Sequence, residues 1–276
     1  MAIKSGHHRL YVIGNGFDLH HGLPCGYADF NVWLQVNKPE VYHMLNHIYG
    51  ECKNEMWCHF EKSLVSFSLD DYPDDVTRSD LMQLNDDLHE ALCEWVKTIR
   101  MPEKGTAIAD IDKNAIFFTF NYTRTLEDFY GIDESKIVHL HGSIDSGNLI
   151  FGHDSLGDGV SDYALEDARE IGMDSDLYMD MVHMKMSQEY SDVFRKPVAD
   201  VIERYRYDFE ALAGIEEMTV LGVSYSDIDK PYFERIIEVT GGDIKVTFGH
   251  HTFWDANHAL AFVEALGLCN TTLVKF

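Results

Sequence analysis

The sequence has few basic residues and none of the short cysteine motifs that hold zinc. Its 22 lysines and arginines stand against 47 aspartates and glutamates, which gives a formal charge of −25. Such a surface repels a phosphate backbone and argues against a nucleic-acid partner, although backbone amides can still bind one small anionic nucleotide. The five cysteines include no Cys-x-x-Cys pair, and their number is odd. We therefore expect reduced thiols without a disulfide framework.

Long apolar segments are absent as well. No apolar run approaches the length needed to cross a bilayer, and no signal peptide precedes the first apolar stretch. We therefore expect a soluble, cytoplasmic protein with no membrane partner. The 15 histidines include adjacent pairs, such as His20-His21 and His250-His251, but no His-Glu-x-x-His motif, so we expect no metal. The 276 residues, 45% of them hydrophobic, suffice for one large domain with a sizeable core.

The chain is organised around residues 9–24. Residues 10–13 are an apolar run typical of a buried parallel strand, and Gly14-Asn15-Gly16 then breaks the run. The two glycines allow a sharp turn that leaves backbone amides open to a ligand. A helix beginning near Phe17 would direct its free N–H groups at a phosphate. The third glycine is Gly22, so the spacing differs from the usual dinucleotide fingerprint, and an ordinary strand-to-helix turn is the alternative.

Strands and helices alternate along the rest of the chain. Further strands are predicted at residues 115–120, 137–140, 218–222, 244–248 and 272–276, with a short one at 149–152. Amphipathic stripes predict a large helical insertion at 25–112, after the first strand, and an acidic, Met-rich segment opens a helical excursion at 154–213. We therefore predict one domain over 1–276, with a mainly parallel, Rossmann-like α/β sheet flanked by helices.

One carboxylate in the predicted insertion stands out. Glu61 lies on an apolar stripe with Trp57, Phe60, Leu64 and Phe67, where a charge needs a partner. It is either a functional acid or one half of a structural ion pair, and the ion pair is the favoured interpretation.

Polar residues follow the predicted strands. They are Gly14, Asn15, Gly16 and Asp18 after the first strand, Asn121 after the second, His141 after the third, and Gly222 and Ser224 after the fourth. In a parallel sheet these positions share one edge, where a substrate crevice forms. Asn121 and His141 directly follow apolar runs and are costly choices for packing alone, which favours a functional role. His139 is expected to point to the opposite face and is the weaker candidate.

Four of these motifs resemble sirtuin-like NAD-binding proteins. Gly14-x-Gly16 followed by Gly22-Leu23-Pro24 is spaced like their Gly-Ala-Gly-x-Ser-x-x-x-Gly-Ile-Pro signature. Residues 119–123, Thr-Phe-Asn-Tyr-Thr, are similar to Thr-Gln-Asn-Ile-Asp. Residues 140–143 and 222–225 resemble Leu-His-Gly-Ser and Gly-Thr-Ser-Leu. Together with Trp57 to Glu61, the residues that form these motifs resemble the bacteriophage abortive infection protein AbiH family, and this resemblance spans nearly the whole chain.

Two departures from sirtuins limit what this resemblance implies. Sirtuin deacetylases carry a zinc module with two Cys-x-x-Cys pairs, and its absence here argues against protein deacylation. Thr123 stands where sirtuins have the Asp that helps to hold nicotinamide, so this contact would pass to Asp18, which replaces a Ser. Related sirtuin-like defence proteins destroy NAD, and the resemblance implies that activity by analogy.

The resulting hypothesis is an NAD glycohydrolase of phage defence that releases nicotinamide. Asn121 would orient the ribose or water, His141 would act as general base, and Asp18 would stabilise positive charge or bind the carboxamide. The predicted nucleotide-binding residues are Gly14, Asn15, Gly16, Phe17, Gly22, Thr123, Gly142, Gly222 and Ser224.

The main alternative is a non-catalytic sensor of NAD or an ADP-ribose-like signal. A toxin that acts on nucleic acid is a third class, which the charge of −25 opposes. A purely structural α/β domain leaves the polar strand ends unexplained. The sequence leaves open whether the protein forms a homo-oligomer or responds to a phage-derived trigger.

Overall fold

The computed structural model describes residues 8–49, 57, 60–64, 76–102, 107–108, 111–153 and 160–276. Its sheet has six parallel strands in the order β3-β2-β1-β4-β5-β6. The strands are β1 Arg9–Ile13, β2 Ile116–Thr119, β3 Ile137–His139, β4 Glu217–Leu221, β5 Lys245–His250 and β6 Thr271–Lys275. This confirms the predicted α/β class. The strand order reverses between β1 and β4, which is the switch point of a doubly wound sheet.

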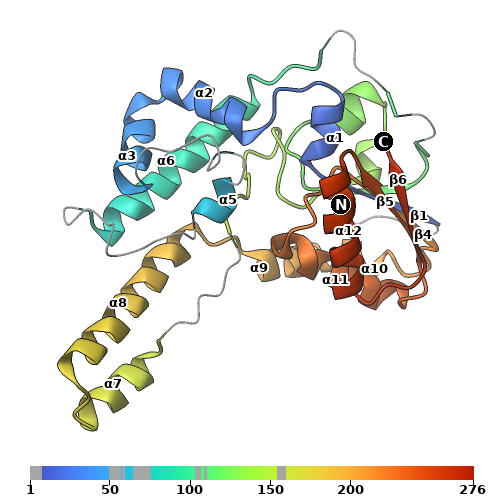
Figure 1. Cartoon of the computed structure of the whole chain (residues 1–276). Helices are drawn as coiled ribbons and strands as arrows, with labels where there is room; N and C mark the ends of the chain where they lie inside the picture. The colour runs from blue at the N-terminus through green and yellow to red at the C-terminus, as the bar shows by residue number, and fades with distance from the viewer. Residues whose placement is uncertain are drawn as a thin grey trace. The chain divides into compact units, whose positions relative to one another are not determined.

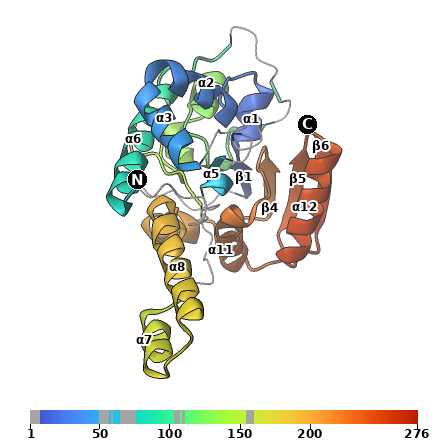
Figure 2. The same ribbon diagram turned by 60° about the vertical axis from the view of Figure 1, so that its left-hand side comes forward.

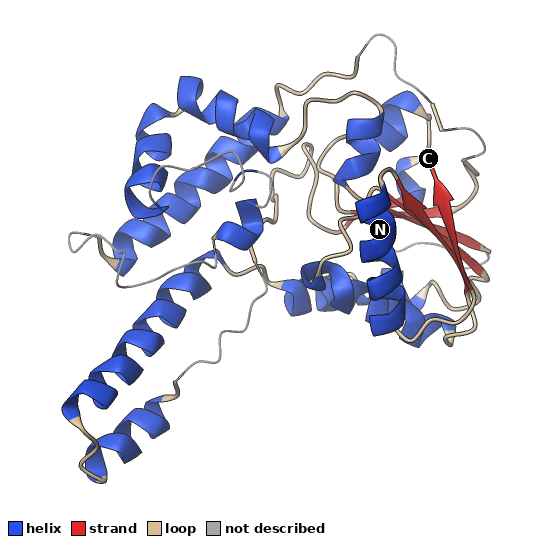
Figure 3. Ribbon diagram, viewed as in Figure 1, coloured by secondary structure: helices blue, strands red, loops and turns tan. Residues whose placement is uncertain are grey.

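Helices cover both faces of this sheet (Figures 1 and 3). Leu10, Phe118 and Val220 face a core that includes residues of α9 to α12. Tyr11 and Phe117 face a second core, on the other side of the sheet, which includes residues of α1 and η2. The helical elements are α1 Asn15–His20, η2 Thr125–Phe129, η3 Glu134–Lys136, α9 Val198–Arg204, α10 Arg206–Glu210, η5 Asp227–Asp229, α11 Lys230–Thr240 and α12 Phe253–Ala265. The central strands are therefore apolar on both faces, as parallel strands between two helical layers must be.

The prediction of a short strand at 149–152 is wrong. These residues form a loop in which Ile150 N–H donates to the carbonyl of His141 at 2.8 Å. Leu149, Ile150 and Phe151 are buried, so they show the apolar run of a strand without pairing as one. Gly152 has a φ of +128°, which is incompatible with an extended strand.

The chain divides into two compact units. The sheet unit comprises Met1–Gly26, Cys93–Ile150 and Pro197–Phe276, and the helical unit comprises Tyr27–Leu92 and Phe151–Lys196. The helical unit contains α2 Tyr27–Asn37, α3 Pro39–Tyr49, α5 Phe60–Ser63, most of α6 Arg78–Val96, α7 Asp162–Glu170, α8 Ser175–Ser191 and η4 Asp192–Phe194. It draws on both the predicted insertion and the predicted excursion. Phe67 of the predicted stripe lies outside the described residues.

Aromatic rings form the core of the helical unit. Trp57 stacks on Phe60 with ring centroids 4.8 Å apart, and Phe30 meets the edge of Trp57 at 6.3 Å. All three side chains are almost completely buried. None of the helices in the described part of the chain combines the length and apolar composition that crossing a bilayer requires.

Glu61 joins the two segments of the helical unit. Its Oε1 lies 3.8 Å from Nζ of the buried Lys196, and it accepts hydrogen bonds from Tyr27 Oη at 2.9 Å and Gly152 N at 3.3 Å. The backbone of Lys196 in turn donates to the His153 carbonyl. These contacts support the ion-pair interpretation of Glu61.

This ion pair predicts a coupled effect on stability. Glu61→Gln keeps an acceptor but leaves the Lys196 charge buried without a carboxylate, so we expect it to cost about 3 kcal/mol. Lys196→Met should cost less, and the double variant should be more stable than the sum of the single changes by at least about 1 kcal/mol. Urea unfolding measures these values.

The matched control is the exposed pair Arg235–Glu238 on α11, whose side chains are 26% and 69% exposed. Its coupling energy should stay below about 0.5 kcal/mol. Additive effects of the Glu61 and Lys196 substitutions would contradict the structural role of the buried pair.

Candidate functional site

The turn after β1 is bonded directly to the turn after β4. Gly14 N–H donates to the Leu221 carbonyl at 2.9 Å, and Gly16 N–H donates to the Gly222 carbonyl at 2.8 Å. Phe17 N–H donates back to the Gly14 carbonyl at 2.9 Å. Two amides of the predicted phosphate cradle, those of Gly14 and Gly16, and the amide of Phe17 at the predicted helix start are therefore already bonded to backbone carbonyls.

Glycine is needed at this contact because the two backbones nearly touch. A Cβ on Gly14 would lie 2.5 Å from the Gly222 carbonyl oxygen, and one on Gly16 would lie 2.8 Å from Gly222 Cα. A Cβ on Gly222, whose φ is +69°, would lie 2.0 Å from Phe17 N. Close packing at the switch point thus accounts for these glycines before any ligand is considered.

Gly22 lies outside this contact. Its φ is +81°, it is exposed, and its N–H donates to the Leu19 carbonyl at 2.9 Å, so it ends the α1 turn. Asn15 is also exposed: its Nδ2 donates to the Cys25 carbonyl at 3.1 Å and its Oδ1 accepts from Cys25 Sγ at 2.9 Å.

Asn121 ties the end of β2 to the β1 turn. Its Nδ2 donates to the Gly14 carbonyl at 3.1 Å, and its backbone N–H donates to Thr119 Oγ1 at 3.0 Å. The side chain is buried, and its Oδ1 has no hydrogen-bond partner among the residues that the structure describes. A buried acceptor without a donor is costly and marks a position that a ligand or water can satisfy.

Asp18 belongs to the same group. It is 1% exposed, its Oδ2 accepts a hydrogen bond from Thr123 Oγ1, and its Oδ1 has no partner within the described chain. Burial raises the pKa of the Asp18 carboxyl, and hydrogen bonds from Thr123, Thr125 and Asn121 only partly oppose that shift. The neutral form of Asp18, which can donate a hydrogen bond, is therefore favoured relative to an exposed aspartate.

His141 has different neighbours. It is 3% exposed, its Nε2 lies 3.3 Å from the Tyr232 hydroxyl, and its ring lies 4.7 Å from that of Phe120. Gly142 follows with a φ of +81° and packs so closely on Asn148 that a Cβ would lie 2.0 Å from the Asn148 carbonyl oxygen. The structure thus places His141 in an aromatic group on the face covered by α11.

His139 lies on the other face of the sheet. Its Nδ1 is 2.9 Å from the Asn121 carbonyl oxygen, and its Nε2 is 3.0 Å from Glu127 Oε1. Regular strand alternation would place residues 139 and 141 on the same face. They differ because β3 ends at His139 and the chain turns at Leu140, which packs into the α9–α12 core.

The loop after β4 carries an exposed serine and a strained tyrosine. Ser224 is exposed, and its Oγ lies 3.3 Å from Ser226 Oγ. Tyr225 has a φ of +56°, the one positive value at a described non-glycine residue, and its hydroxyl donates to the Gly249 carbonyl at 2.5 Å. The sequence gives no signal for the positive φ of Tyr225, because Gly222, three residues earlier, is the residue expected to take a turn conformation.

The site thus consists of two groups. The first joins Gly14, Gly16, Asp18, Asn121 and Thr123 with Gly222, and the second joins His141 with Phe120 and Tyr232. Tyr232 was missed by sequence reasoning, since it lies 91 residues from His141. No cluster of three or more His, Cys, Asp or Glu side chains suited to a metal occurs in the described residues.

The strand order and the polar residues at the carboxyl edge of the sheet define a Rossmann-like α/β protein. Comparison with protein-family models matches residues 10–82 and 71–250 to the family described as bacteriophage abortive infection AbiH. The chain belongs to this family, which suggests a role in abortive infection. Comparisons with curated proteins and with solved structures gave no match.

The packing at Gly222 makes a testable prediction. Gly222→Ala should destabilise the protein by at least about 3 kcal/mol, because left-handed strain adds to a clash with the backbone of Phe17. Gly131→Ala is the matched control: Gly131 has a similar φ of +66° and open space around it, so only about 1–2 kcal/mol is expected. Equal losses in chemical denaturation would refute the packing role.

The burial of Asp18 predicts a dependence of stability on pH. The raised pKa means that the folded state holds the Asp18 proton more tightly than the unfolded chain, whose ordinary value is 3.8. Protonated Asp18 therefore stabilises the folded state. This contribution to the free energy of unfolding is complete below pH 3.8 and is lost as the pH rises towards the folded pKa, by up to about 1.4 kcal/mol per pH unit.

Asp18→Asn removes this titration. The stability of the wild type relative to Asp18→Asn should fall as the pH rises above 3.8, as measured by urea unfolding at several pH values. Asp243→Asn, at an exposed position before β5, should follow the wild type. A difference between wild type and Asp18→Asn that stays constant with pH would contradict the burial argument.

Proposed function

We propose that this abortive-infection protein binds NAD at the carboxyl edge of the sheet and cleaves the N-glycosidic bond to nicotinamide. The observation that carries the proposal is the switch point between β1 and β4, beside which the buried oxygens of Asp18 and Asn121 lack partners within the described chain. Doubly wound sheets bind nucleotides at this position. The family match supports the defence role.

The bonded glycine amides limit how a dinucleotide can be held. The N–H groups of Gly14 and Gly16 already donate to Leu221 and Gly222, so a pyrophosphate cannot use them without breaking the contact between the two turns. The exposed side chains of Asn15 and Ser224 lie on these same turns. In our proposal they contact the pyrophosphate and the adenosine side, and the glycines act by holding the two turns together.

The buried side chains supply the chemistry. Asn121 Oδ1 accepts a hydrogen bond from a ribose hydroxyl or from the attacking water, and the Asp18 carboxyl binds the carboxamide or faces the developing positive charge. Thr123 fixes one oxygen of Asp18 and leaves the other for the substrate. His141, beside the Tyr232 hydroxyl, accepts a proton directly or through water.

Burial favours a second candidate function. Asn121 is 7% exposed and His141 is 3% exposed, which suits a site that registers a bound nucleotide without turning it over. A sensor of NAD or ADP-ribose would use the same binding residues. The two functions differ in whether nicotinamide is released.

Incubation of the purified protein with NAD, followed by chromatography for free nicotinamide, tests this proposal. The double variant Asn121→Ala/His141→Gln should reduce release at least about 100-fold, since an oriented water and a general base are lost together. Asn257→Ala/His258→Ala is the matched control, with both residues exposed on α12, and should retain activity.

Thermal unfolding with and without NAD separates the outcomes. Stabilisation by NAD without nicotinamide release would establish the sensor. Full release by Asn121→Ala/His141→Gln, in a variant that still unfolds cooperatively, would place the chemistry elsewhere. Neither release nor stabilisation in the wild type would reject both functions.

A further inference from the structure

The helices α7 and α8 form a hairpin with well-defined caps. They lie side by side in both views of the chain (Figures 1 and 2). Ser161 Oγ accepts from Ala164 N–H at the start of α7, and Asp174 Oδ1 accepts from Asp176 N–H at the start of α8. Gly172, with a φ of +67°, supplies the turn between the helices.

This hairpin exposes large apolar side chains. The hairpin apolar surface comprises Tyr163, Ile171, Leu177, Met179, Met184 and Met186, which are between 38% and 77% exposed. None of the described residues of α8 is buried. Leu177 and Met184 are seven residues apart, two turns of helix, so they share a stripe. At 3.6 residues per turn, Met179 and Met186 lie on the opposite side of α8 from this stripe, so the exposed apolar residues form separate stripes. The stripe of Leu177 and Met184 is the one that we consider as an interaction surface.

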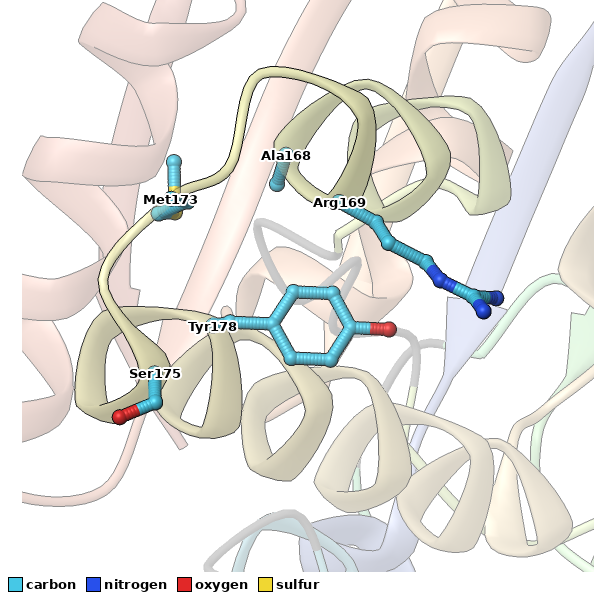
Figure 4. A pocket seen from close by; sticks show the side chains of 5 residues that line it. All are labelled: Ala168, Arg169, Met173, Ser175 and Tyr178. Carbon is cyan, nitrogen blue, oxygen red and sulfur yellow. The ribbon is translucent and has the colours of Figure 1, made fainter.

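A hollow between the helices offers room for a partner's side chain. It has a volume of about 370 Å³ and is lined by Ala168, Arg169, Met173, Ser175 and Tyr178. Figure 4 shows Arg169 and Tyr178 extending between the two helices, with Met173 and Ser175 near the turn. Interfaces gain much of their affinity where an anchoring side chain fills such a hollow.

The charge of the hairpin identifies the kind of partner. Residues 160–192 contain nine Asp and Glu against two Lys and Arg, together with five methionines. A second copy of the chain would bring the same negative charge, and an anionic lipid surface would also be repelled. A cationic partner gains from this field, and flexible methionines adapt to varied apolar side chains.

We propose that the hairpin apolar surface is a docking site for a basic amphipathic helix of a partner protein. The apolar face of that helix packs on the stripe of Leu177 and Met184 and places one side chain in the hollow beside Tyr178. Its cationic face meets the carboxylates of the hairpin, including Asp176 and Asp180. The residues of this docking site belong to the helical unit, and none of them takes part in the proposed nucleotide site.

A fluorescent amphipathic peptide of leucine and lysine with helical periodicity is the probe, and its anisotropy is measured with the full chain. Leu177→Asn/Met184→Gln should weaken binding at least tenfold. Val32→Asn/Val36→Gln is the matched control, because both valines are exposed and lie about one turn apart on α2. It should leave the affinity unchanged. Asp176→Asn/Asp180→Asn should weaken binding and reduce its dependence on salt.

Three results would overturn this proposal. The first is equal binding by the wild type and Leu177→Asn/Met184→Gln, or equal binding of a peptide with the same composition but no apolar face. The second is a wild-type dimer that becomes monomeric in Leu177→Asn/Met184→Gln, which assigns the surface to a second copy. The third is binding to phosphatidylserine-containing vesicles that this variant loses. Circular dichroism confirms that each variant is folded.

Discussion

The backbone contact between the turns after β1 and β4 is the constraint on which the site depends. Two N–H groups of the first turn donate to carbonyls at the end of β4, and no side chain fits between Gly14, Gly16 and Gly222. At the switch point of the sheet, the two turns therefore touch through backbone atoms alone. It also positions the start of α1, and therefore Asp18, against the loop that carries Asn121 and Thr123.

In the proposed site, the closed backbone contact assigns ligand binding to side chains and not to backbone amides. In an open glycine turn, free N–H groups bind an anion. Here the amides of Gly14 and Gly16 are bonded, and two buried acceptors beside them, Asp18 Oδ1 and Asn121 Oδ1, have no partner among the described residues. Because burial raises the pKa of Asp18, its neutral carboxyl can donate where an ionised one could only accept. In the proposed site, a neutral Asp18 carboxyl suits a polar neutral group such as a carboxamide.

Sequence reasoning recovered the strands because buried parallel strands are continuous apolar runs bounded by polar residues. It failed at 149–152, where a buried loop has the apolar composition of a strand but does not pair with the sheet, and Gly152 has a positive φ. Glycine at 14, 16 and 222 suits an open cradle and a tight contact equally well, so the sequence alone left the two interpretations open. The pairing of His141 with Tyr232 is invisible because no local pattern links residues 91 positions apart.

The acidic composition has a second consequence beyond opposing nucleic acid. An exposed apolar hairpin in a neutral protein would favour association with other copies. A formal charge of −25, with nine carboxylates in residues 160–192, makes each copy repel the next. The same charges favour a cationic partner, so attraction and repulsion together set the specificity of the surface. In our proposal the shortage of basic residues opposes the burial of Leu177 and Met184 against a second copy and favours a partner of opposite charge.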